Sequence, residues 1–349
     1  MSKKSHHLKL QQLELFSYQK NNLPKGNAMK SEENKQLSEI QSFIGSQKVF
    51  LANDQSYNVN FFSTGSYYLD QILGTNGWPK GRIIEIFGSE SSGKSTLALK
   101  AIAECQKFDG NAVYIDSEGS FDIKWAEKNQ IDTNKLILAR PETGEQAITI
   151  INALVKTKLV DLIIVDSVAS MTPVVEIDAN ITDQSMGLHA RLMSKAMRLI
   201  QSSLLTNNRT TILFINQTRA KIGNVYGSNV TTTGGNALKF AASMRIELKK
   251  YEAIRDGADI IGYQIKATVI KNKLAAPMKS ALLPFYFDTG FDINAEIIQE
   301  AIRKEIIIKK GTWYYFDKKN IGQGLVAVKE KLSKDREIFN EIKKLVYQN

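Results

Sequence analysis

The chain has 349 residues, of which 43% are hydrophobic, so it is long and apolar enough to bury a substantial core and is not a disordered polypeptide. Its 46 Lys and Arg residues against 36 Asp and Glu residues give a net charge of +10, which fits a polyanionic partner but is also common in basic proteins without one. A single cysteine, Cys105, excludes a disulfide framework, and no apolar run approaches the roughly 20 residues that cross a bilayer, so we expect a cytoplasmic protein.

The N-terminal part of the chain differs from the rest. Residues 1–28 are polar and basic without sustained periodicity, and we expect them to be a disordered extension. Residues 29–58 are predicted to form an oligomerisation helix and a linker. The helix is amphipathic, because apolar residues recur at helical spacing at Leu37, Ile40, Phe43 and Ile44. Its apolar face lies outside the main core, so we expect it to cover something else, such as a neighbouring subunit.

Residues 59–290 alternate between short β-branched apolar runs and longer helical patterns. Strands are predicted at residues 82–87, 112–115, 135–139, 161–165 and 211–215. Helices between the strands imply an α/β fold with a mostly parallel central sheet that is covered on both faces. Three later runs with short connections predict an antiparallel extension of this sheet, at residues 245–250, 263–271 and 281–287. Residues 291–349 are predicted to form a small α+β C-terminal domain, with two or three short helices and a β-like insert at residues 311–316.

A phosphate-binding loop follows the first of these strands. Residues 88–95 match the pattern G-x-x-x-x-G-K-[ST] at every fixed position, and a predicted helix, 95–106, begins directly after them. Backbone amides of such a loop close around phosphate oxygens, Lys94 reaches the β- and γ-phosphates, and Ser95 can bind Mg²⁺. The predicted nucleotide-binding residues are Gly88, Ser89, Glu90, Ser91, Ser92, Gly93, Lys94, Ser95 and Thr96.

Two carboxylates at strand ends are candidates for the chemistry. Asp166 follows a buried strand at the edge of the sheet where ligands of α/β folds collect, so it can hold Mg²⁺ through water; the alternative is a helix cap. Glu118 lies two residues past the end of another strand, at Ile115-Asp116, and can orient a water for attack on the γ-phosphate. Asp116 is the rival for that role. The longer side chain of Glu118 reaches further over the phosphate, which favours it.

Six segments occur in an order that is highly specific when taken together. They are residues 88–96, Ile115-Asp116-Ser117-Glu118, Val165-Asp166-Ser167-Val168-Ala169, Phe214-Ile215-Asn216-Gln217, residues 232–240 (Thr-Thr-Gly-Gly-Asn-Ala-Leu-Lys-Phe) and Lys271-Asn272-Lys273. From about residue 30 to near its C-terminus, the chain resembles the bacterial RecA recombinases. The resemblance implies a RecA-type P-loop ATPase core that uses ATP and Mg²⁺.

The function implied by this resemblance is that of a DNA-dependent ATPase. Such a protein forms a helical filament on single-stranded DNA and catalyses homologous pairing and strand exchange in recombinational repair, and we expect it to stimulate repressor self-cleavage in the SOS response. The implied partners are single-stranded DNA, homologous duplex DNA and further copies of this chain. A repressor of the LexA type and loading mediators are further expected partners. No interaction with a membrane is expected.

The resemblance also implies roles for single residues near the nucleotide. Glu118 would activate water, and Gln217 would sense the γ-phosphate, although a strand-end Gln can simply cap a turn. Asp122 and Trp125 would lie near the adenine, with Trp125 where the family usually has Tyr. Contacts across a subunit boundary to a neighbour's ATP would come from Lys271, Lys273 and Phe287. The plain alternatives are a solvated basic turn for the lysines and strand packing for the phenylalanine.

Two segments resemble the DNA-binding loops of the family. Residues 217–235 have no hydrophobic periodicity and are predicted to form a long loop, whose cations and glycines suit phosphates and whose apolar residues Ile222, Val225 and Tyr226 can wedge against bases. Residues 176–191 resemble the first DNA loop, with Met186 placed to insert between bases. The predicted DNA-binding residues are Met186, Arg191, Arg198, Arg219, Lys221, Ile222, Gly234, Gly235 and Asn236.

The sequence departs from the family pattern at several positions. Asn229-Val230 replaces the usual Pro and acidic residue, and His189 stands where a small residue is usual and has no assigned role. The chain ends without the acidic tail that often restrains duplex binding in the family. Two rival functions are a hexameric helicase built on the same ATPase core and a nucleotide-gated scaffold for repressor self-cleavage. The helicase has no reason to carry the Thr-Gly-Gly-Asn-Ala segment or the two lysines 271 and 273.

Overall fold

The computed structural model describes residues 38–43, 49, 58–179, 187–220 and 230–348, and the chain falls into two units, Met1–Asn58 and Val59–Asn349. In the first unit residues 38–43 are helical, within the segment where an amphipathic helix is predicted, and the Gln41 amide donates a hydrogen bond to the Val49 carbonyl (2.7 Å). The predicted extension, residues 1–28, lies outside the described residues.

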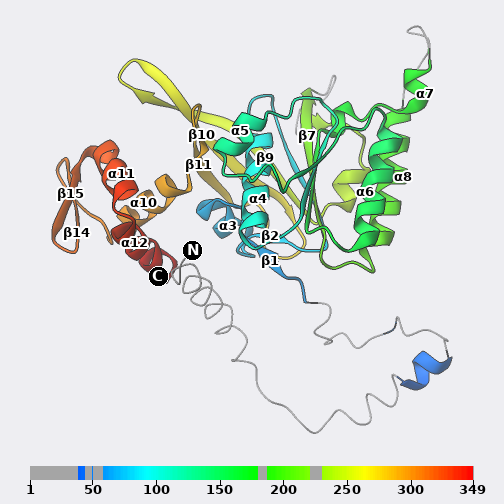
Figure 1. Ribbon diagram of the computed structural model, residues 1–349, viewed down its shortest axis with the longest axis horizontal. Coiled ribbons are helices and arrows are strands. Elements are labelled where there is room, and N and C mark those ends of the chain that lie inside the picture. Colours follow the sequence, from blue (N-terminus) through cyan, green and yellow to red (C-terminus); the bar gives the residue numbers. More distant parts are fainter. Residues whose placement is uncertain (1–37, 44–48, 50–57, 180–186, 221–229, 349) are drawn as a thin grey trace. The chain divides into compact units, whose positions relative to one another are not determined.

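The second unit is built on one large sheet, with strands in the order β12-β11-β10-β9-β3-β7-β6-β4-β5 (Figure 1). The strands are β3 (Ile83–Gly88), β4 (Ala112–Asp116), β5 (Ile137–Ala139), β6 (Leu162–Asp166), β7 (Thr211–Ala220), β9 (Met244–Asp256), β10 (Asp259–Asn272), β11 (Ser280–Tyr286) and β12 (Gly290–Phe291). Pairing is parallel from β9 through β3, β7, β6 and β4 to β5, and antiparallel from β9 to β12. The predicted α/β fold with a mostly parallel sheet is confirmed.

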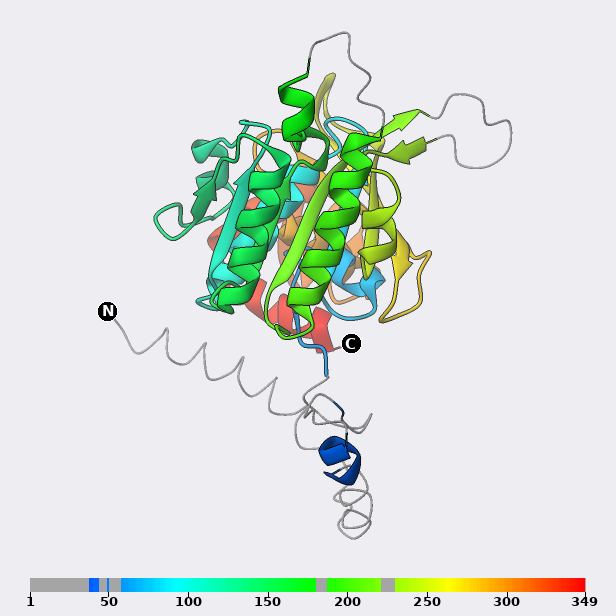
Figure 2. The ribbon, with the colours of Figure 1, turned by 90° about the vertical axis from the view of Figure 1, so that its right-hand side faces the viewer.

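Helices cover both faces of this sheet (Figures 1 and 2). One face carries α3 (Tyr67–Leu73), α4 (Lys94–Lys107) and α5 (Ile123–Lys128), and the other carries α6 (Gly144–Thr157), α8 (Leu188–Leu204) and α9 (Ala237–Ala241). Successive residues of a strand enter opposite cores: in β6, Leu162 and Ile164 pack on the α4 side, whereas Ile163 and Val165 pack on the α6 side. Burial on both faces explains why these strands read as continuous apolar runs rather than as alternating patterns.

The structure corrects three expectations about the sheet. The antiparallel extension begins one strand later than predicted, because β9 pairs parallel with β3. The stretch 217–235 is not one long loop: β7 continues to Ala220, and β8 (Val230–Thr232) pairs antiparallel with it, so the two form a ribbon. The predicted strand 135–139 is reduced to the three residues of β5. The stretch 217–235 is predicted to be a loop because it lacks hydrophobic periodicity, and the pattern therefore does not reveal the paired strands at its two ends.

The remaining short elements connect these layers. A two-stranded sheet of β1 (Phe61–Phe62) and β2 (Trp78–Pro79) precedes β3. After β6 the chain forms a 3-10 turn, η2 (Val168–Ser170), and the short helix α7 (Val174–Ile177). Cys105 in α4 is buried, and burial raises the pKa of its thiol to about 12, so the thiol stays protonated at neutral pH. Among the described residues, no helix is both long enough and apolar enough to cross a membrane.

The C-terminal region has a core of its own. It contains α10 (Ile293–Arg303), an antiparallel sheet of β13 (Ile308–Lys310), β14 (Trp313–Phe316) and β15 (Lys319–Gln323), and the helices α11 (Gly324–Lys334) and α12 (Arg336–Gln348). The single β-like insert that the sequence predicts is therefore a three-stranded sheet. Tyr67 of α3 packs into the same core as Ile297 and Phe339, so the region is joined to the start of the large domain.

A buried carboxylate lies at this junction. Glu296 of α10 is fully buried; it accepts hydrogen bonds at both oxygens from the Ser66 hydroxyl (2.9 Å each) and at one from the Tyr68 amide (3.0 Å). Burial raises the pKa of Glu296 to about 8. Asp70, also buried, has its pKa raised to about 6 by the same cause. Among the described residues, neither of these two acidic side chains forms an ion pair with a Lys, Arg or His side chain within 4 Å.

Candidate functional site

The phosphate loop joins β3 to α4, and its glycines are required by the surrounding packing. Gly93 has φ +83° at the start of α4, and a Cβ there would lie 2.9 Å from the Phe291 ring. At Gly88, a Cβ would lie 2.2 Å from the carbonyl oxygen of Leu248 on the neighbouring strand β9. The two fixed glycines of the motif thus lie at positions where the packing leaves no room for a side chain.

Lys94 is folded into this loop. Its ammonium donates to the Ser89 carbonyl (2.6 Å), which also accepts from the Ser92 hydroxyl (2.8 Å). Burial lowers the pKa of Lys94, although Asp166 and Glu118 favour the charged form. A buried ammonium beside the amino end of a 14-residue helix makes the loop suited to an anion.

Asp166, at the end of β6, is held by two hydroxyl groups. Ser95 on α4 donates to Asp166 Oδ2 (2.6 Å), and Tyr114 on β4 donates to the same oxygen (2.7 Å). Burial raises the pKa of Asp166, and both hydrogen bonds oppose this rise. No group of three or more His, Cys, Asp or Glu side chains in the described part of the chain could hold a metal ion by itself. A cation between Ser95 and Asp166 therefore needs further oxygen ligands from phosphate or water.

Glu118 and Gln217 come together from different strands. The Gln217 amide, on β7, lies 3.3 Å from Glu118 Oε1, just beyond β4. Glu118 is exposed to solvent, and the pKa of its carboxyl is raised, first by partial burial and then by the negative charge of Asp166. The sequence placed both residues at strand ends, and strand order makes those ends neighbours.

Asp116 has a different environment. It accepts hydrogen bonds from the amides of Ser120 (3.0 Å) and Phe121 (3.3 Å), and Arg140 Nε lies 3.3 Å from it. These contacts close the turn that carries Glu118. Asp116 is occupied in holding that turn, whereas Glu118 is free to approach solvent.

The predicted adenine-side residues lie beside the first turn of α4. The indole of Trp125 donates to the Thr96 hydroxyl (3.3 Å), and Asp122 caps α5 by accepting from the Trp125 amide (3.1 Å). Trp125 is half-buried, so part of its ring faces solvent. Phe287 follows β11; it is half exposed and packs edge-on against Tyr263 (5.6 Å between ring centroids).

A buried polar network connects β3, β7 and β9. Glu85 is paired with Arg245 and accepts from the Asn216 amide (2.9 Å). The same amide donates to the Thr233 carbonyl (3.1 Å), and Asn216 Oδ1 accepts from the Thr233 hydroxyl and from the backbone amide of Gln217 (2.9 Å). The network therefore ties the strand before the phosphate loop to the backbone that follows β8.

Two glycines after β8 lie against α8. Gly234 and Gly235 have φ values of +82° and +73°, and a Cβ on either would come within 3.0 Å of a side chain of α8, Met193 or Ala190. Arg191 and Arg198 are exposed on α8, and the Asn236 side chain accepts from Lys239 (3.3 Å). Three predicted DNA contacts lie outside the described residues, as does the side chain of a fourth: Met186, Lys221, Ile222 and Arg219.

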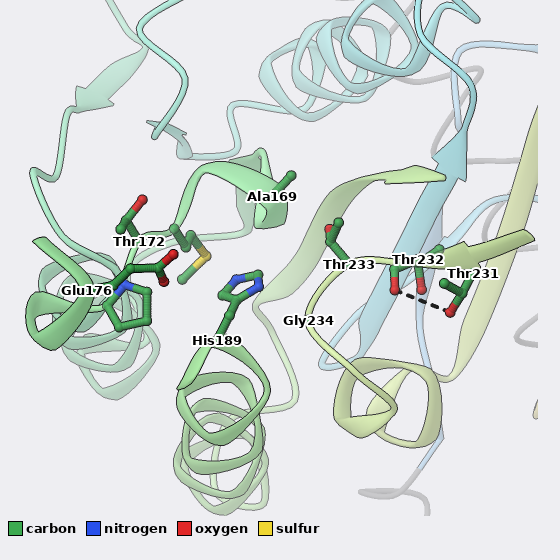
Figure 3. A pocket seen from close by; sticks show the side chains of 10 residues that line it. Ala169, Thr172, Glu176, His189, Thr231, Thr232, Thr233 and Gly234 are labelled. Carbon is green, nitrogen blue, oxygen red and sulfur yellow. Dashed lines mark hydrogen bonds between the residues drawn. The ribbon is translucent and has the colours of Figure 1, made fainter. Parts of the chain in front are cut away.

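A polar cavity of about 330 Å³ opens between α7, the start of α8 and β8 (Figure 3). His189 points into it from the first turn of α8, between Thr172 and Glu176 on one side and Thr233 and Gly234 on the other. The α7 helix and the β7–β8 ribbon project from the same edge of the molecule (Figure 2). Residues of both predicted DNA loops therefore face one cavity.

Comparison with known proteins decides the family. The model of the RecA N-terminal domain matches residues 32–292, and that of the RecA C-terminal domain matches residues 295–349. The chain belongs to the RecA family. A protein named Protein RecA in Ureaplasma parvum is 47% identical over 307 residues, which cover 88% of this chain and 92% of that protein. Those of Malacoplasma penetrans (46% identical, 89% and 94% covered) and Mycoplasma mycoides (43% identical, 96% and 99% covered) are also similar.

This membership confirms the family that the six segments indicated. As a RecA-family protein, the chain has a recombinase role in DNA recombination and repair and is a DNA-dependent ATPase. The family also implies that it binds DNA and assembles into filaments of its own kind.

The two lysines of the segment Lys271-Asn272-Lys273 do not contact the phosphate loop of their own chain among the described residues. Lys271, near the end of β10, donates to the carbonyls of Lys239 (2.7 Å) and Phe240 (3.0 Å) and so caps the end of α9. Lys273 is exposed. Within the described residues, no hydrogen bond or ion pair connects either lysine with residues 88–95.

The sequence did not identify several residues of the site. Tyr114, Glu85 and Arg245 belong to strands that the apolar pattern predicts, but their polar contacts run between strands far apart in the chain. Asn216 was part of a RecA-like segment without an assigned role. A polar residue within an otherwise apolar buried strand was the one available signal, because a buried polar group needs a partner.

Proposed function

We propose that this chain binds ATP with Mg²⁺, polymerises on single-stranded DNA and exchanges it with homologous duplex. The observation that carries the proposal is β7: Gln217 contacts Glu118 beside the phosphate loop, and the same strand continues into the ribbon with β8. One rigid element thus joins the nucleotide side to the DNA side. A change at the γ-phosphate that moves Gln217 would also move the ribbon.

The nucleotide roles follow from the contacts of each residue. Residues 88–96 would hold the phosphates, with Lys94 turning from the Ser89 carbonyl to the β- and γ-phosphates. Ser95 and Asp166 would hold Mg²⁺, which when bound neutralises charge on the phosphates. Glu118 would orient the attacking water; the pKa of its carboxyl is raised, first by partial burial and then by the negative charge of Asp166. Asp122 and Trp125 would border the adenine.

Three residues are proposed to act on the nucleotide of a neighbouring protomer: Lys271, Lys273 and Phe287. The exposure of Lys273 and the half-exposed ring of Phe287 support this role, because both side chains are accessible to a neighbouring protomer. Lys271 caps α9 in the isolated chain and would have to change partners. Hydrolysis would then depend on assembly.

The DNA side is proposed to use backbone amides and cations around the cavity of Figure 3. Gly234, Gly235 and Asn236 offer amides at a turn that only glycine forms without strain, and Arg191 and Arg198 offer exposed charge on α8. Arg219 and Lys221 would add phosphate contacts, and Met186 and Ile222 would contact bases. The net charge of +10 favours all of these contacts.

Further parts of the proposal concern the wider context. The DNA-bound filament would stimulate self-cleavage of a LexA-type repressor in an SOS response, with loading mediators as additional partners, and would act in the cytoplasm. We also propose four regions: an extension (1–28), an oligomerisation helix and linker (29–58), the ATPase core (59–290) and a C-terminal domain (291–349).

The test is ATP turnover with and without single-stranded DNA. We expect turnover to rise by at least about tenfold when DNA is added, and to fall again as salt displaces the DNA. Strand exchange between a single strand and homologous duplex should require the same nucleotide. A rate indifferent to DNA would contradict the proposal. Unwinding of a forked duplex in the absence of any homologous strand would favour the helicase alternative.

A further inference from the structure

Tyr114 is a buried tyrosine whose hydroxyl reaches the proposed metal site. It lies in the middle of β4, on the face of the sheet that α4 covers, and is 3% exposed. In the parallel pairing of β4 with β6 it stands opposite Ile164, and Asp166 lies two residues further along on the same face. The side chain therefore extends along the strand direction to Asp166.

The hydroxyl makes one specific contact. It donates to Asp166 Oδ2 at 2.7 Å, the oxygen that also accepts from Ser95 at 2.6 Å. Among the described residues, no hydrogen bond is donated to Asp166 Oδ1. Two donors thus hold one oxygen, and the other remains available.

The ring of Tyr114 does not need the hydroxyl for packing. It contacts Phe121 (4.9 Å between centroids) and belongs to the apolar core beneath α4, where a phenylalanine would fill the same space. A hydroxyl in such a core is tolerated only because it has a partner. The hydrogen bond from the Tyr114 hydroxyl therefore fixes the orientation of the Asp166 carboxylate.

Resting on the proposed function, we infer that Tyr114 is a positioning residue for Mg²⁺: its hydroxyl fixes Asp166 so that the carboxylate can orient Ser95 and the water around the metal. The Ser95 hydroxyl directs its hydrogen bond to Asp166, so the lone pairs of Ser95 Oγ remain for the cation. If the Asp166 carboxylate turned away, the Ser95 hydroxyl would lose the hydrogen bond that orients it. Tyr114 would act through Asp166, without binding the nucleotide or the metal itself.

The test is the isosteric variant Tyr114→Phe, followed by the Mg²⁺ dependence of binding of a fluorescent ATP analogue to the full chain. The half-saturating Mg²⁺ concentration should rise by about three- to tenfold, because one charge-assisted hydrogen bond is lost. The same shift should appear in DNA-stimulated ATP turnover and be overcome by excess Mg²⁺. The matched control is Tyr67→Phe, which removes another buried hydroxyl, one that accepts from Lys304 (3.4 Å). It should leave the Mg²⁺ dependence unchanged.

A second measurement separates positioning from general damage. In an Asp166→Asn background, Tyr114→Phe should add no further rise in the Mg²⁺ requirement, because its effect passes through the carboxylate. An unchanged half-saturating concentration in Tyr114→Phe, or a further rise in the double variant, would overturn the inference. Failure of the proposed function looks different: in that case the unaltered chain itself would bind the analogue without regard to Mg²⁺.

Discussion

Asp116 and Glu118 are two carboxylates two residues apart with opposite surroundings. Asp116 is buried, with two backbone amides and Arg140 around it, and so serves the turn. Glu118 stands at the solvent side with the Gln217 amide 3.3 Å away. Water can reach Glu118 but not the lone pairs that Asp116 already uses. The contacts of the two residues therefore support Glu118, rather than Asp116, as the residue that orients the attacking water.

The variant Glu118→Gln should lower DNA-stimulated ATP turnover by about 100-fold or more, because the amide cannot accept the proton of the attacking water. Nucleotide-dependent binding to single-stranded DNA should remain, since the phosphate loop is untouched. Both are measured in one set of samples, by phosphate release and by fluorescence anisotropy of labelled DNA. Glu127→Gln, an exposed carboxylate on α5, is the control. Normal turnover in Glu118→Gln would return the role to Asp116.

At the scale of elements, the joint between α3 and α10 depends on an acid. The pKa of Glu296 is raised from an ordinary 4.5 to about 8, so between these values the folded protein holds a proton that the unfolded chain releases. Stability at this joint is therefore lost as pH rises from about 4.5 to about 8, and changes little above that. Asp70, with its pKa near 6, contributes a trend of the same sign at lower pH.

Glu296→Gln cannot ionise and should escape this loss. The stability of the variant relative to the unaltered chain should improve between pH 6 and pH 8, by on the order of 1 kcal/mol per pH unit at most. Urea midpoints at pH 6, 7 and 8 measure the difference. The exposed Glu330→Gln should show a constant difference. If the Glu296→Gln difference is equally constant, Glu296 is already ionised at pH 6 in the folded protein.

Elements were predictable from the sequence where they depend on local pattern. The phosphate loop is a contiguous motif, and the apolar runs of β3, β4 and β6 are recognisable as strands from the sequence alone. The direction of β9 depends on its pairing with β3, and the three residues of β8 have meaning only beside β7. Tyr114 and Asp166 lie 52 positions apart, and only the strand order brings them together. Periodicity carries no information on strand order, so these contacts could not be foreseen.

For the whole molecule, the proposed active site is divided between two copies of the chain. Glu118 and the phosphate loop belong to one protomer, whereas Lys273 has no contact with that loop in its own chain among the described residues. Such an arrangement is head-to-tail, and an interface of that kind builds open filaments. Assembly and catalysis would then be the same event.

Mixing two inactive variants tests this division. Glu118→Gln and Lys273→Ala should each have little ATP turnover alone, but a 1:1 mixture on DNA should recover up to about a quarter of the normal rate, because one pairing in four joins an intact Glu118 to an intact neighbouring lysine. Phosphate release measures the recovery. The matched control pairs Glu118→Gln with Lys94→Ala, whose defects lie in the same half of the site and should not complement. A mixture as inactive as its parts would place Lys273 within its own protomer's site.

Because β7 is one continuous strand that contacts both Glu118 and β8, insertions within it should disturb these contacts. Side chains alternate along a strand, so inserting a single amino acid between Ile215 and Asn216 would reverse the orientations of Asn216 and Gln217, turning the first away from Glu85 and the second away from Glu118. Two inserted amino acids would restore the alternation but displace the pairing with β8. A change of length by one or two amino acids at this point of β7 should therefore disrupt either the two side-chain contacts or the pairing with β8.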